Sequence, residues 1–324
     1  MSILLDVQHL KKYFGVTEGT LHAVDDVSFQ LEKGETLGVV GESGCGKSTL
    51  GKTILRLTNP TDGTVLFDGQ DITALSDKEF TKLRPQMQMI FQDPLSSLNP
   101  RMSIKEQIEE PLLIYNVYPD KNEREQKVLE LMDTVGLARR YADMYPHELD
   151  GGRRQRIGIA RGLSLNPQLI ICDEPVSALD VLIQAQILNL LQDLQKEKGL
   201  TYMFITHDLS VVKHISNHIC VMYLGQIVEM SESKELFEHT LHPYSKALPS
   251  AIPVPSLQKK RQRIALKGEL VSPIDPKPGC RFAPRCLYAK PECFESNPEL
   301  KDVGNGHLVA CHRVAELNDL NEIK

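Results

Sequence analysis

The alternation of apolar and polar positions predicts a sheet and a helix near the start of the chain. Val27, Phe29 and Leu31 alternate with polar residues, so they share one face of a half-buried strand. Residues 36–40 are a continuous apolar run, as expected of a strand that is covered on both faces. Residues 47–57 then carry apolar side chains at helical spacing. These patterns predict a strand, a loop and a helix in succession.

The middle of the chain has a helical pattern, and strands and helices alternate again after it. A strand that closes on an Asp-Gly turn is expected at 63–72, and residues 103–145 show helical patterns without a clear strand. We interpret 103–145 as a helical insertion. Strand-like runs follow at 168–174, 201–207 and 219–230. A long helix is expected at 180–199, with an apolar face of Ile183, Ile187, Leu190, Leu191 and Leu194 and with Gly199 as its stop. Alternating strand and helix units predict a mainly parallel sheet covered by helices.

Composition and charge narrow the class of protein. The 324 residues are 41% apolar, which is enough for a sizeable core. The chain has 37 Lys and Arg against 43 Asp and Glu, so it lacks the overall positive field that nucleic-acid binding usually requires. No apolar run reaches the roughly 20 residues of a membrane span, and the N-terminal residues lack a signal-peptide pattern. We therefore expect a cytosolic globular protein with no nucleic-acid partner and with a Pro-rich, basic linker at 249–263.

A glycine-rich stretch carries the first candidate chemistry. Residues 41–48, GESGCGKS, match GxxxxGK[ST] after a predicted buried strand and before a predicted helix. In this setting the backbone N–H groups surround phosphates, Lys47 reaches the β and γ phosphates, and Ser48 binds Mg²⁺. The disfavoured alternative is a glycine-rich turn without function. We interpret Cys45 as a residue without a functional role of its own, because backbone groups carry the function of such a loop. The candidate ATP-binding residues of this loop are Gly41, Ser43, Gly44, Cys45, Gly46, Lys47, Ser48 and Thr49.

Two acidic residues end a later apolar strand. Asp173 can hold the Mg²⁺ shell through water, and Glu174 can polarise the attacking water. A strand that ends in Asp-Glu is common, so the pair becomes specific only together with the lysine-containing loop. His207 follows the apolar run at 201–206 and could sense the γ phosphate, although a histidine there is also typical of a helix-cap neighbour.

Further motifs give the chain a resemblance to a known family. The set comprises GESGCGKST, FQDP with Gln92, LDGG before RRQRIGIARGL, LIICDEP, SALD and ITHD. In order and spacing it resembles the ATP-binding cassette of ABC transporters over residues 3–250. The segments FQDPLSSLNPRM and HPYSKAL and the cysteine-rich tail narrow the resemblance to the ATPase subunits of oligopeptide and dipeptide permeases, of the F type.

The resemblance implies an α/β fold, the P-loop NTPase ABC cassette, with a RecA-like core, an antiparallel β subdomain and a helical subdomain at about 93–160. The cassette is expected at 1–252 and a small Cys-rich C-terminal extension at 253–324. Two cassettes would face head to tail and hold each ATP between the loop of one chain and the signature segment of the other. The implied partners are a second, different ABC ATPase, two transmembrane permease subunits and an extracytoplasmic peptide-binding protein. This chain would then be peripheral, at the cytoplasmic face of the cell membrane.

The same resemblance implies roles for single residues. Phe14, or Tyr13 beside it, would stack on adenine, although a lone aromatic on a strand is also an ordinary core residue. Gln92 would contact Mg²⁺ and report nucleotide to the membrane subunits. Asp180 would lie at the dimer seam, and His207 would be the switch. The implied catalytic residues are Glu174, His207 and Gln92, and the implied Mg²⁺ ligands are Ser48, Gln92 and Asp173.

The signature segment departs from the family pattern LSGGQ. Residues 149–153 read LDGGR, so Asp150 replaces the serine that, with the amides of Gly151 and Gly152, would embrace the partner's γ phosphate. A carboxylate about 4 Å from a phosphate costs several kcal/mol at an effective dielectric of about 20, unless a cation such as Arg153 offsets it. The alternative is that Asp150 only caps the following helix. We expect a heterodimer in which the site that receives Asp150 hydrolyses ATP weakly.

Four of the seven cysteines cluster in the tail. Cys280, Cys286, Cys293 and Cys311 follow the spacing CX5CX6CX17C in a segment with little apolar content. In a cytosolic protein such a group indicates a metal site that stabilises a segment too small for its own core. Peptide-permease ATPases of similar sequence carry a [4Fe-4S] cluster at such cysteines, so we expect one here. Zn²⁺ and free or paired thiols are the alternatives.

Other functions fit parts of this pattern. A related permease for nickel or another solute would use the same cassette, because the cassette does not contact the cargo. A soluble, non-transport ABC ATPase usually has two cassettes in one chain or long insertions, which this sequence lacks. A small-molecule kinase would have no use for Gln92 or the DGG segment. Peptide import is therefore the favoured function.

Overall fold

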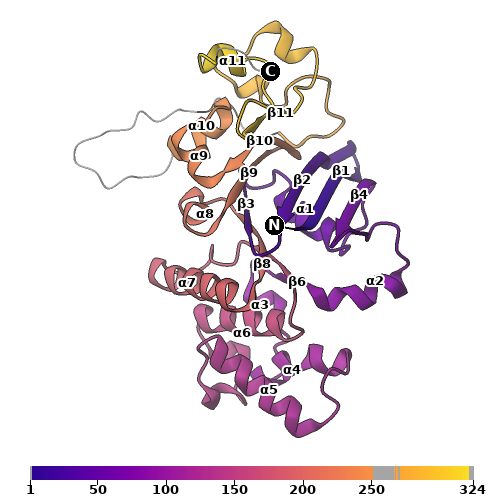
Figure 1. Ribbon diagram of the computed structural model, residues 1–324, viewed down its shortest axis with the longest axis vertical. Helices are drawn as coiled ribbons and strands as arrows, with labels where there is room; N and C mark the ends of the chain where they lie inside the picture. The colour runs from indigo at the N-terminus through magenta and orange to yellow at the C-terminus, as the bar shows by residue number, and fades with distance from the viewer. Residues whose placement is uncertain (1, 251–265, 267, 269–270, 321–324) are drawn as a thin grey trace, which may run out of the picture. The chain divides into compact units, whose positions relative to one another are not determined.

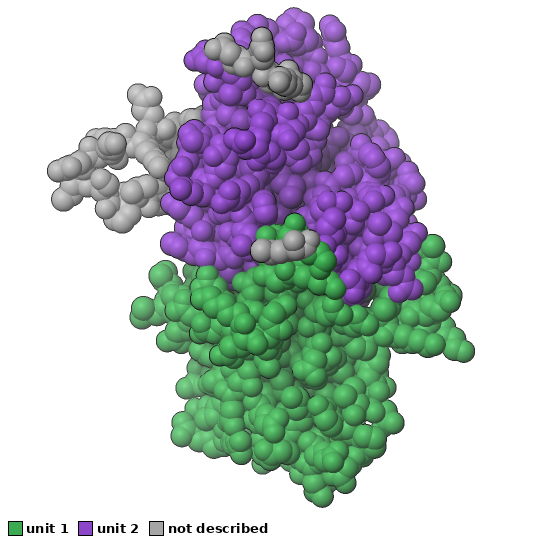
Figure 2. Space-filling view, viewed as in Figure 1, with its two compact units in different colours: residues 1–2, 32–35, 74–204 green, residues 3–31, 36–73, 205–324 purple. Residues whose placement is uncertain are grey.

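Two compact units make up the chain. The computed structural model describes residues 2–250, 266, 268 and 271–320, so most of the linker predicted at 249–263 lies outside the described residues. The first unit consists of residues 1–2, 32–35 and 74–204, and the second of residues 3–31, 36–73 and 205–324 (Figure 2). The helical insertion belongs to the first unit. The glycine-rich loop and the described part of the cysteine-rich extension both belong to the second.

A four-stranded sheet lies in the second unit. It consists of β1 (Ile3–Val16), β2 (Gly19–Glu32), β4 (Asp62–Phe67) and β5 (Gln70–Asp71), in the order β2-β1-β4-β5. Figure 1 shows β2, β1 and β4 of this sheet. Val27, Phe29 and Leu31 are all buried, as their alternation predicts. Asp68 and Gly69 have positive φ values of 48° and 79° and form the predicted turn between β4 and β5.

The second unit also contains strands around the glycine-rich loop. These are β3 (Thr36–Val40), β9 (His218–Tyr223), β10 (Gln226–Glu232), β11 (Lys301–Asp302) and β12 (Leu308–Val309). Strand β3 pairs in parallel with β9, whereas β9 with β10, β10 with β12, and β12 with β11 are antiparallel pairs. The run at 219–230 is a hairpin, because Leu224 and Gly225 take left-handed φ values of 45° and 83° and reverse the chain. The pairing in this unit is therefore mixed, where alternation predicted mainly parallel strands.

The helices of the second unit are α1 (Lys47–Ile54), α8 (Leu209–Ile215), α9 (Ser233–Glu238), α10 (Pro243–Ser250) and α11 (Val314–Leu317). Strand β12 places the cysteine-rich extension on β10, where Leu241, Val309 and Val314 form a buried apolar cluster. The extension therefore shares a core with the rest of its unit. This explains how a segment with so few apolar residues can be ordered.

The first unit contains the predicted helical insertion. Its helices are α2 (Asp77–Leu83), α3 (Pro94–Ser97), α4 (Ile104–Ile114), α5 (Lys121–Thr134), α6 (Gly151–Leu163) and α7 (Val181–Lys198). Its strands are β6 (Met87–Ile90) and β7 (Leu169–Asp173). Strand β8 (Thr201–Thr206) begins in this unit and ends in the second. A capping box of Ser103 and Glu106 begins α4, which packs against α5 and α6. Gly199, with φ of 65°, ends α7 as predicted. Among the described residues, no helix combines the length and the apolar character that crossing a membrane requires.

Candidate nucleotide-binding site

The lysine loop, residues 41–48, connects β3 to α1. Lys47 is buried, and its Nζ donates hydrogen bonds to the carbonyls of Gly41 at 2.8 Å and Glu42 at 2.9 Å. Ser48 lies in the first turn of α1, where backbone N–H groups have no partner within the helix and favour an anion. Cys45 is buried, and this burial raises the pKa of its thiol. The loop thus offers a lysine ammonium and a helix N-terminus, while Cys45 is in keeping with a packing role.

Two glycines give the lysine loop its path. Gly41 and Gly46 have φ values of 155° and 103°, which other residues rarely adopt. A Cβ atom on Gly41 would lie 2.2 Å from the carbonyl oxygen of Met222, and one on Gly46 would lie 2.1 Å from that of Ala23. The backbone of the loop therefore packs directly against neighbouring backbone. Any side chain at either position would displace the loop.

The predicted acidic residues lie at the end of β7. Asp173 and Glu174 are both buried. Glu174 has a left-handed φ of 46°, a conformation that costs a non-glycine residue about 1 kcal/mol or more and is often found at functional sites. Gln92 Nε2 donates a hydrogen bond of 2.9 Å to Glu174 Oε2. Two residues predicted from separate motifs, Gln92 and the candidate base Glu174, are therefore in direct contact within the first unit.

Asp150 both caps a helix and forms an ion pair. Its Oδ1 accepts a hydrogen bond of 2.8 Å from the backbone N–H of Arg153, which caps α6. Its Oδ2 accepts from the Arg153 guanidinium, which also lies 5.2 Å from the centre of the Tyr141 ring. Both side chains of the pair are about half exposed, at 56% for Asp150 and 46% for Arg153. The sequence suggested two separate interpretations, in which Asp150 caps the helix or Arg153 offsets its charge. The structure shows both.

The other signature and switch residues lie at helix and strand ends. A Cβ atom on Gly152 would lie 2.6 Å from Cγ2 of Ile183, so glycine allows α6 to approach α7 closely. Asp180 caps α7, because its Oδ1 accepts from the N–H of Ile183 at 3.1 Å. His207 is exposed directly after β8, where a side chain can meet a ligand.

The two candidates for adenine stacking differ in their surroundings. The ring of Tyr13 stacks on His22 at 3.9 Å between centroids, and its hydroxyl donates to the carboxylate of Asp25. Burial would raise the pKa of Asp25, but hydrogen bonds from Tyr13 and His22 and the nearby Arg281 lower it overall. Phe14 is 36% exposed, and the Lys12 ammonium lies over its ring at 4.7 Å. Phe14 therefore offers the more accessible ring.

The tail cysteines gather around one small cavity. All seven cysteines lie among the described residues and are free thiols, so the paired alternative is not seen. Cys280, Cys286, Cys293 and Cys311 all line this cavity. The sulfurs of Cys280, Cys286 and Cys311 each accept a hydrogen bond from the backbone N–H two residues further on, an arrangement common for metal-bound thiolates. Burial raises the pKa of Cys280 to about 11. Among the described residues, no group of three or more His, Cys, Asp or Glu side chains is arranged to hold a metal ion.

Comparisons with known proteins place this geometry in a family. Residues 24–177 match the ABC transporter family, and residues 228–293 match the C-terminal region of oligopeptide/dipeptide transporters. The chain is 54% identical over 319 residues to the oligopeptide transport ATP-binding protein AppF of Bacillus subtilis, covering 95% of this chain and 97% of that protein. This chain belongs to the ATP-binding proteins of oligopeptide and dipeptide ABC transporters. It is also 50% identical over 326 residues to OppF of Salmonella typhimurium, covering 97% of each chain.

Solved structures of ABC cassettes support the same conclusion about the fold. The dimeric structure of MJ0796, described as a bacterial ABC transporter cassette, matches with a TM-score of 0.66 and 31% identity, over 71% of this chain and 99% of that one. The predicted cassette fold is therefore confirmed. As an ATP-binding protein of this family, the chain is an ATPase, and ATP with Mg²⁺ is its expected nucleotide.

Contacts between the extension and the lysine loop were not predicted from the sequence. Arg285 pairs with Glu42 of the lysine loop, and Arg281 pairs with Asp25. Arg285 and Glu42 are 243 positions apart, and although Glu42 lies within the lysine loop, no sequence pattern indicates a role for either side chain. The only available signal was that both arginines directly adjoin candidate metal-ligating cysteines, Cys280 and Cys286.

Proposed function

We propose that this chain binds and hydrolyses ATP to energise the import of oligopeptides or dipeptides through a membrane complex. The observation that carries the proposal is the relationship to oligopeptide transport ATP-binding proteins over almost the whole chain, including the C-terminal region. The buried Lys47 in a glycine-built loop supplies the phosphate-binding chemistry that such a function requires. The chain would act peripherally, at the cytoplasmic face of the membrane, with two transmembrane permease subunits and an extracytoplasmic peptide-binding protein.

Each site residue has a role in this proposal. Lys47 and the loop amides bind the β and γ phosphates, and Ser48, Asp173 and Gln92 provide oxygen ligands for Mg²⁺ or its water shell. Glu174 polarises the attacking water, and its left-handed backbone and its hydrogen bond from Gln92 hold the carboxylate in one orientation. Because Gln92 contacts Glu174, a movement of the Gln92 loop would change the position of the base. This contact offers a route by which permease subunits could control hydrolysis.

The assembly in this proposal is an asymmetric heterodimer. This chain's lysine loop, Glu174 and His207 form one ATP site with the signature segment of a second, different cassette, while Asp180 lies at the seam. The second site receives this chain's signature, with Asp150 in place of serine. The carboxylate weakens phosphate binding there, and the Arg153 guanidinium bound to it offsets part of the repulsion. The second site therefore hydrolyses ATP slowly.

Assays of ATP hydrolysis by the assembled complex test the proposed function. The complex is purified with its permease subunits and binding protein, and ATP hydrolysis is measured with di- to pentapeptides and, separately, with Ni²⁺. Peptide-stimulated hydrolysis that is lost in a Lys47→Ala variant supports the proposal. Stimulation by Ni²⁺ alone would assign the chain to a metal permease, and hydrolysis that no solute affects would contradict a role in import.

We propose further that Cys280, Cys286, Cys293 and Cys311 hold a [4Fe-4S] cluster. The four cysteines share one cavity, and backbone N–H groups already donate to three of the sulfurs. The spacing CX5CX6CX17C departs from the short CxxC pairs usual for zinc sites, which favours the cluster over Zn²⁺. When bound, the cluster would supply iron–thiolate bonds that tie the extension together.

Metal analysis distinguishes these alternatives. Protein purified without oxygen should be coloured, absorb visible light, and contain about four iron atoms per chain. A Cys286→Ser variant should lose iron, whereas Cys220→Ser, which changes a buried cysteine outside the cavity, should keep it. A colourless protein that contains one zinc would establish Zn²⁺ instead, and a protein without either metal would refute both.

A further inference from the structure

Two arginines of the cysteine-rich extension contact residues around the lysine loop. Arg281 directly follows Cys280, and Arg285 directly precedes Cys286. Phe282 between them is buried and fixes this part of the extension in its unit. Neither arginine belongs to the nucleotide-binding motifs, so their contacts require a separate explanation.

Arg285 forms a two-point ion pair with the lysine loop. Its Nη1 donates to Glu42 Oε2 at 2.6 Å, and its Nη2 donates to Glu42 Oε1 at 3.1 Å. The side chain of Arg285 is only 10% exposed, and that of Glu42 is 30% exposed. Two parallel, charge-assisted hydrogen bonds fix both the distance and the orientation of the partners. Removing one partner would leave the other as a poorly solvated charge.

Glu42 connects this ion pair to the phosphate-binding lysine. Its backbone N–H donates to the hydroxyl of Tyr244 at 2.9 Å, and its carbonyl accepts from Lys47 Nζ at 2.9 Å. The Tyr244 ring packs against Phe282 of the extension, with 5.4 Å between centroids. The extension therefore holds Glu42 both through the Arg285 side chain and through Tyr244. A change in the position of Glu42 would be passed to the carbonyl that contacts Lys47.

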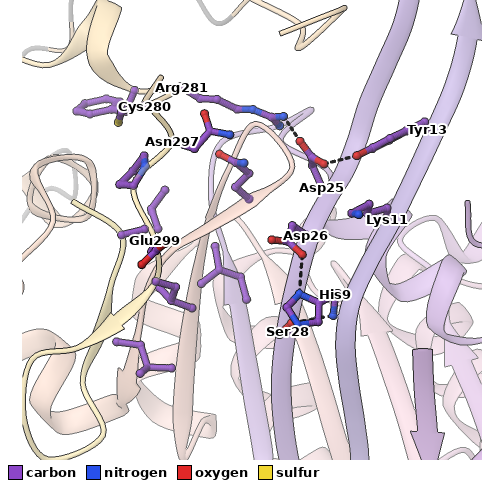
Figure 3. A pocket seen from close by; sticks show the side chains of 18 residues that line it. His9, Lys11, Tyr13, Asp25, Asp26, Ser28, Cys280, Arg281, Asn297 and Glu299 are labelled. Carbon is purple, nitrogen blue, oxygen red and sulfur yellow. Dashed lines mark hydrogen bonds and ion pairs between the residues drawn. The ribbon is translucent and has the colours of Figure 1, made fainter. Parts of the chain in front are cut away.

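Arg281 provides a second connection to the same loop. Its guanidinium donates to the carbonyl of Leu224. It also donates to the carboxylate of Asp25 (Figure 3). The N–H of Asp25 donates to the carbonyl of Gly225 at 2.8 Å, and the N–H of Gly225 donates to the carbonyl of Cys45 at 2.8 Å. The β9–β10 turn, which Arg281 contacts through Leu224, therefore supports the middle of the lysine loop at Cys45.

We propose that Arg285 is a positioning residue for ATP binding, which acts through Glu42 on the part of the lysine loop that contacts Lys47. The inference rests on the proposed function, because it assumes that ATP binds at this loop. Without the guanidinium, the Glu42 carboxylate is an unpaired negative charge on the loop that would bind the triphosphate, and the loop loses one anchor. Both effects weaken ATP binding, and neither changes the position of the water that attacks the phosphate.

Substitution of Arg285 tests the inference directly. In Arg285→Gln, the dissociation constant for Mg²⁺ with adenylyl imidodiphosphate, a non-hydrolysable ATP analogue, should rise about tenfold in calorimetric titration of the full chain. In the assembled complex, KM for ATP should rise similarly while kcat changes less than about twofold. Arg285→Lys keeps one positive charge but not the two-point geometry, so it should recover part of the affinity.

Two controls separate positioning from general damage to the extension. In a Glu42→Gln background, adding Arg285→Gln should change the dissociation constant less than about threefold, because the ion pair is already absent. If Arg285→Gln does not fold, Arg285→Lys replaces it in this comparison. Lys290→Gln removes an ion pair with Glu316 inside the extension, at 3.0 Å, and should leave nucleotide affinity unchanged.

Specific results would overturn the inference. A folded Arg285→Gln protein with the affinity of the original would show that the ion pair does not position the loop. An equal loss in Lys290→Gln would show that any damage to the extension has this effect. If the unsubstituted chain failed to bind the analogue, the proposed function would fail instead, so the two failures are distinguishable.

Discussion

Replacement of Asp150 by serine should speed ATP hydrolysis at the site that receives this signature segment. Serine is as good a helix cap as aspartate, so α6 keeps the hydrogen bond from the backbone N–H of Arg153. The ion pair that is lost joins two half-exposed side chains and is worth about 1 kcal/mol at most. The fold should therefore be unaffected, and the change acts mainly on the phosphate.

The size of the effect follows from the charges. A carboxylate about 4 Å from a phosphate charge costs about 4 kcal/mol at an effective dielectric of about 20. The Arg153 guanidinium bound to that carboxylate, if roughly 2 Å farther from the phosphate, returns about 3 kcal/mol. The net penalty of the pair is about 1 kcal/mol, so removing both charges, in Asp150→Ser combined with Arg153→Gln, should raise the turnover of this site about fivefold. Asp150→Ser alone removes only the repulsion and keeps the guanidinium, so it should raise the turnover further. Arg153→Gln alone removes the positive charge that offsets the Asp150 carboxylate, so it should lower the turnover of this site.

The assay must measure ATP hydrolysis only at the site that receives the Asp150-containing signature segment. Glu174→Gln in this chain silences the site built on its own lysine loop, so the remaining hydrolysis comes from the other site. ATP turnover of the complex is then compared with Asp150 intact, with Asp150→Ser, and with Asp150→Ser combined with Arg153→Gln. Unchanged turnover and unchanged nucleotide affinity in a folded Asp150→Ser complex would show that Asp150 is only a helix cap.

Two further predictions concern stability. Burial lowers the pKa of His242 to about 4, so the folded protein keeps this histidine neutral while the unfolded chain protonates it near pH 6.5. The contribution of His242 to the free energy of unfolding should therefore fall by about 3 kcal/mol between pH 6.5 and 4, and His242→Asn should reduce the pH dependence of stability in urea unfolding. A slope that His242→Asn leaves unchanged would contradict this. Gly46→Ala should lower the free energy of unfolding by about 2–4 kcal/mol, because the added Cβ would lie 2.1 Å from a backbone oxygen at a φ of 103°. A melting temperature equal to that of the original protein would count against that reasoning.

Local patterns predicted the elements of this chain well. The alternation of Val27, Phe29 and Leu31 corresponds to a buried face, and Gly199 ends a helix where it was expected. These features depend on neighbours in the sequence, which a pattern can represent. The hairpin at 219–230 was not recognised, because its turn consists of Leu224 and Gly225, and leucine rarely adopts a left-handed conformation.

The candidate site was predicted unevenly, for a physical reason. Lys47 and Glu174 belong to motifs whose spacing reflects one local backbone path. The contact of Gln92 with Glu174 spans 82 positions, and that of Arg285 with Glu42 spans 243, so each depends on tertiary packing that no local pattern encodes. The contacts of Asp150 were predicted in part, since the sequence suggested both a helix cap and an offsetting arginine without showing that the two occur together.

Peptide uptake by the complete complex tests the central claim most directly. Proteoliposomes that contain the complex with ATP trapped on the cassette side are given binding protein and a labelled oligopeptide. The account predicts uptake that requires ATP and that Lys47→Ala in this chain abolishes, because the fast site of the proposed asymmetric assembly uses this lysine. Undiminished uptake by the Lys47→Ala complex would contradict it.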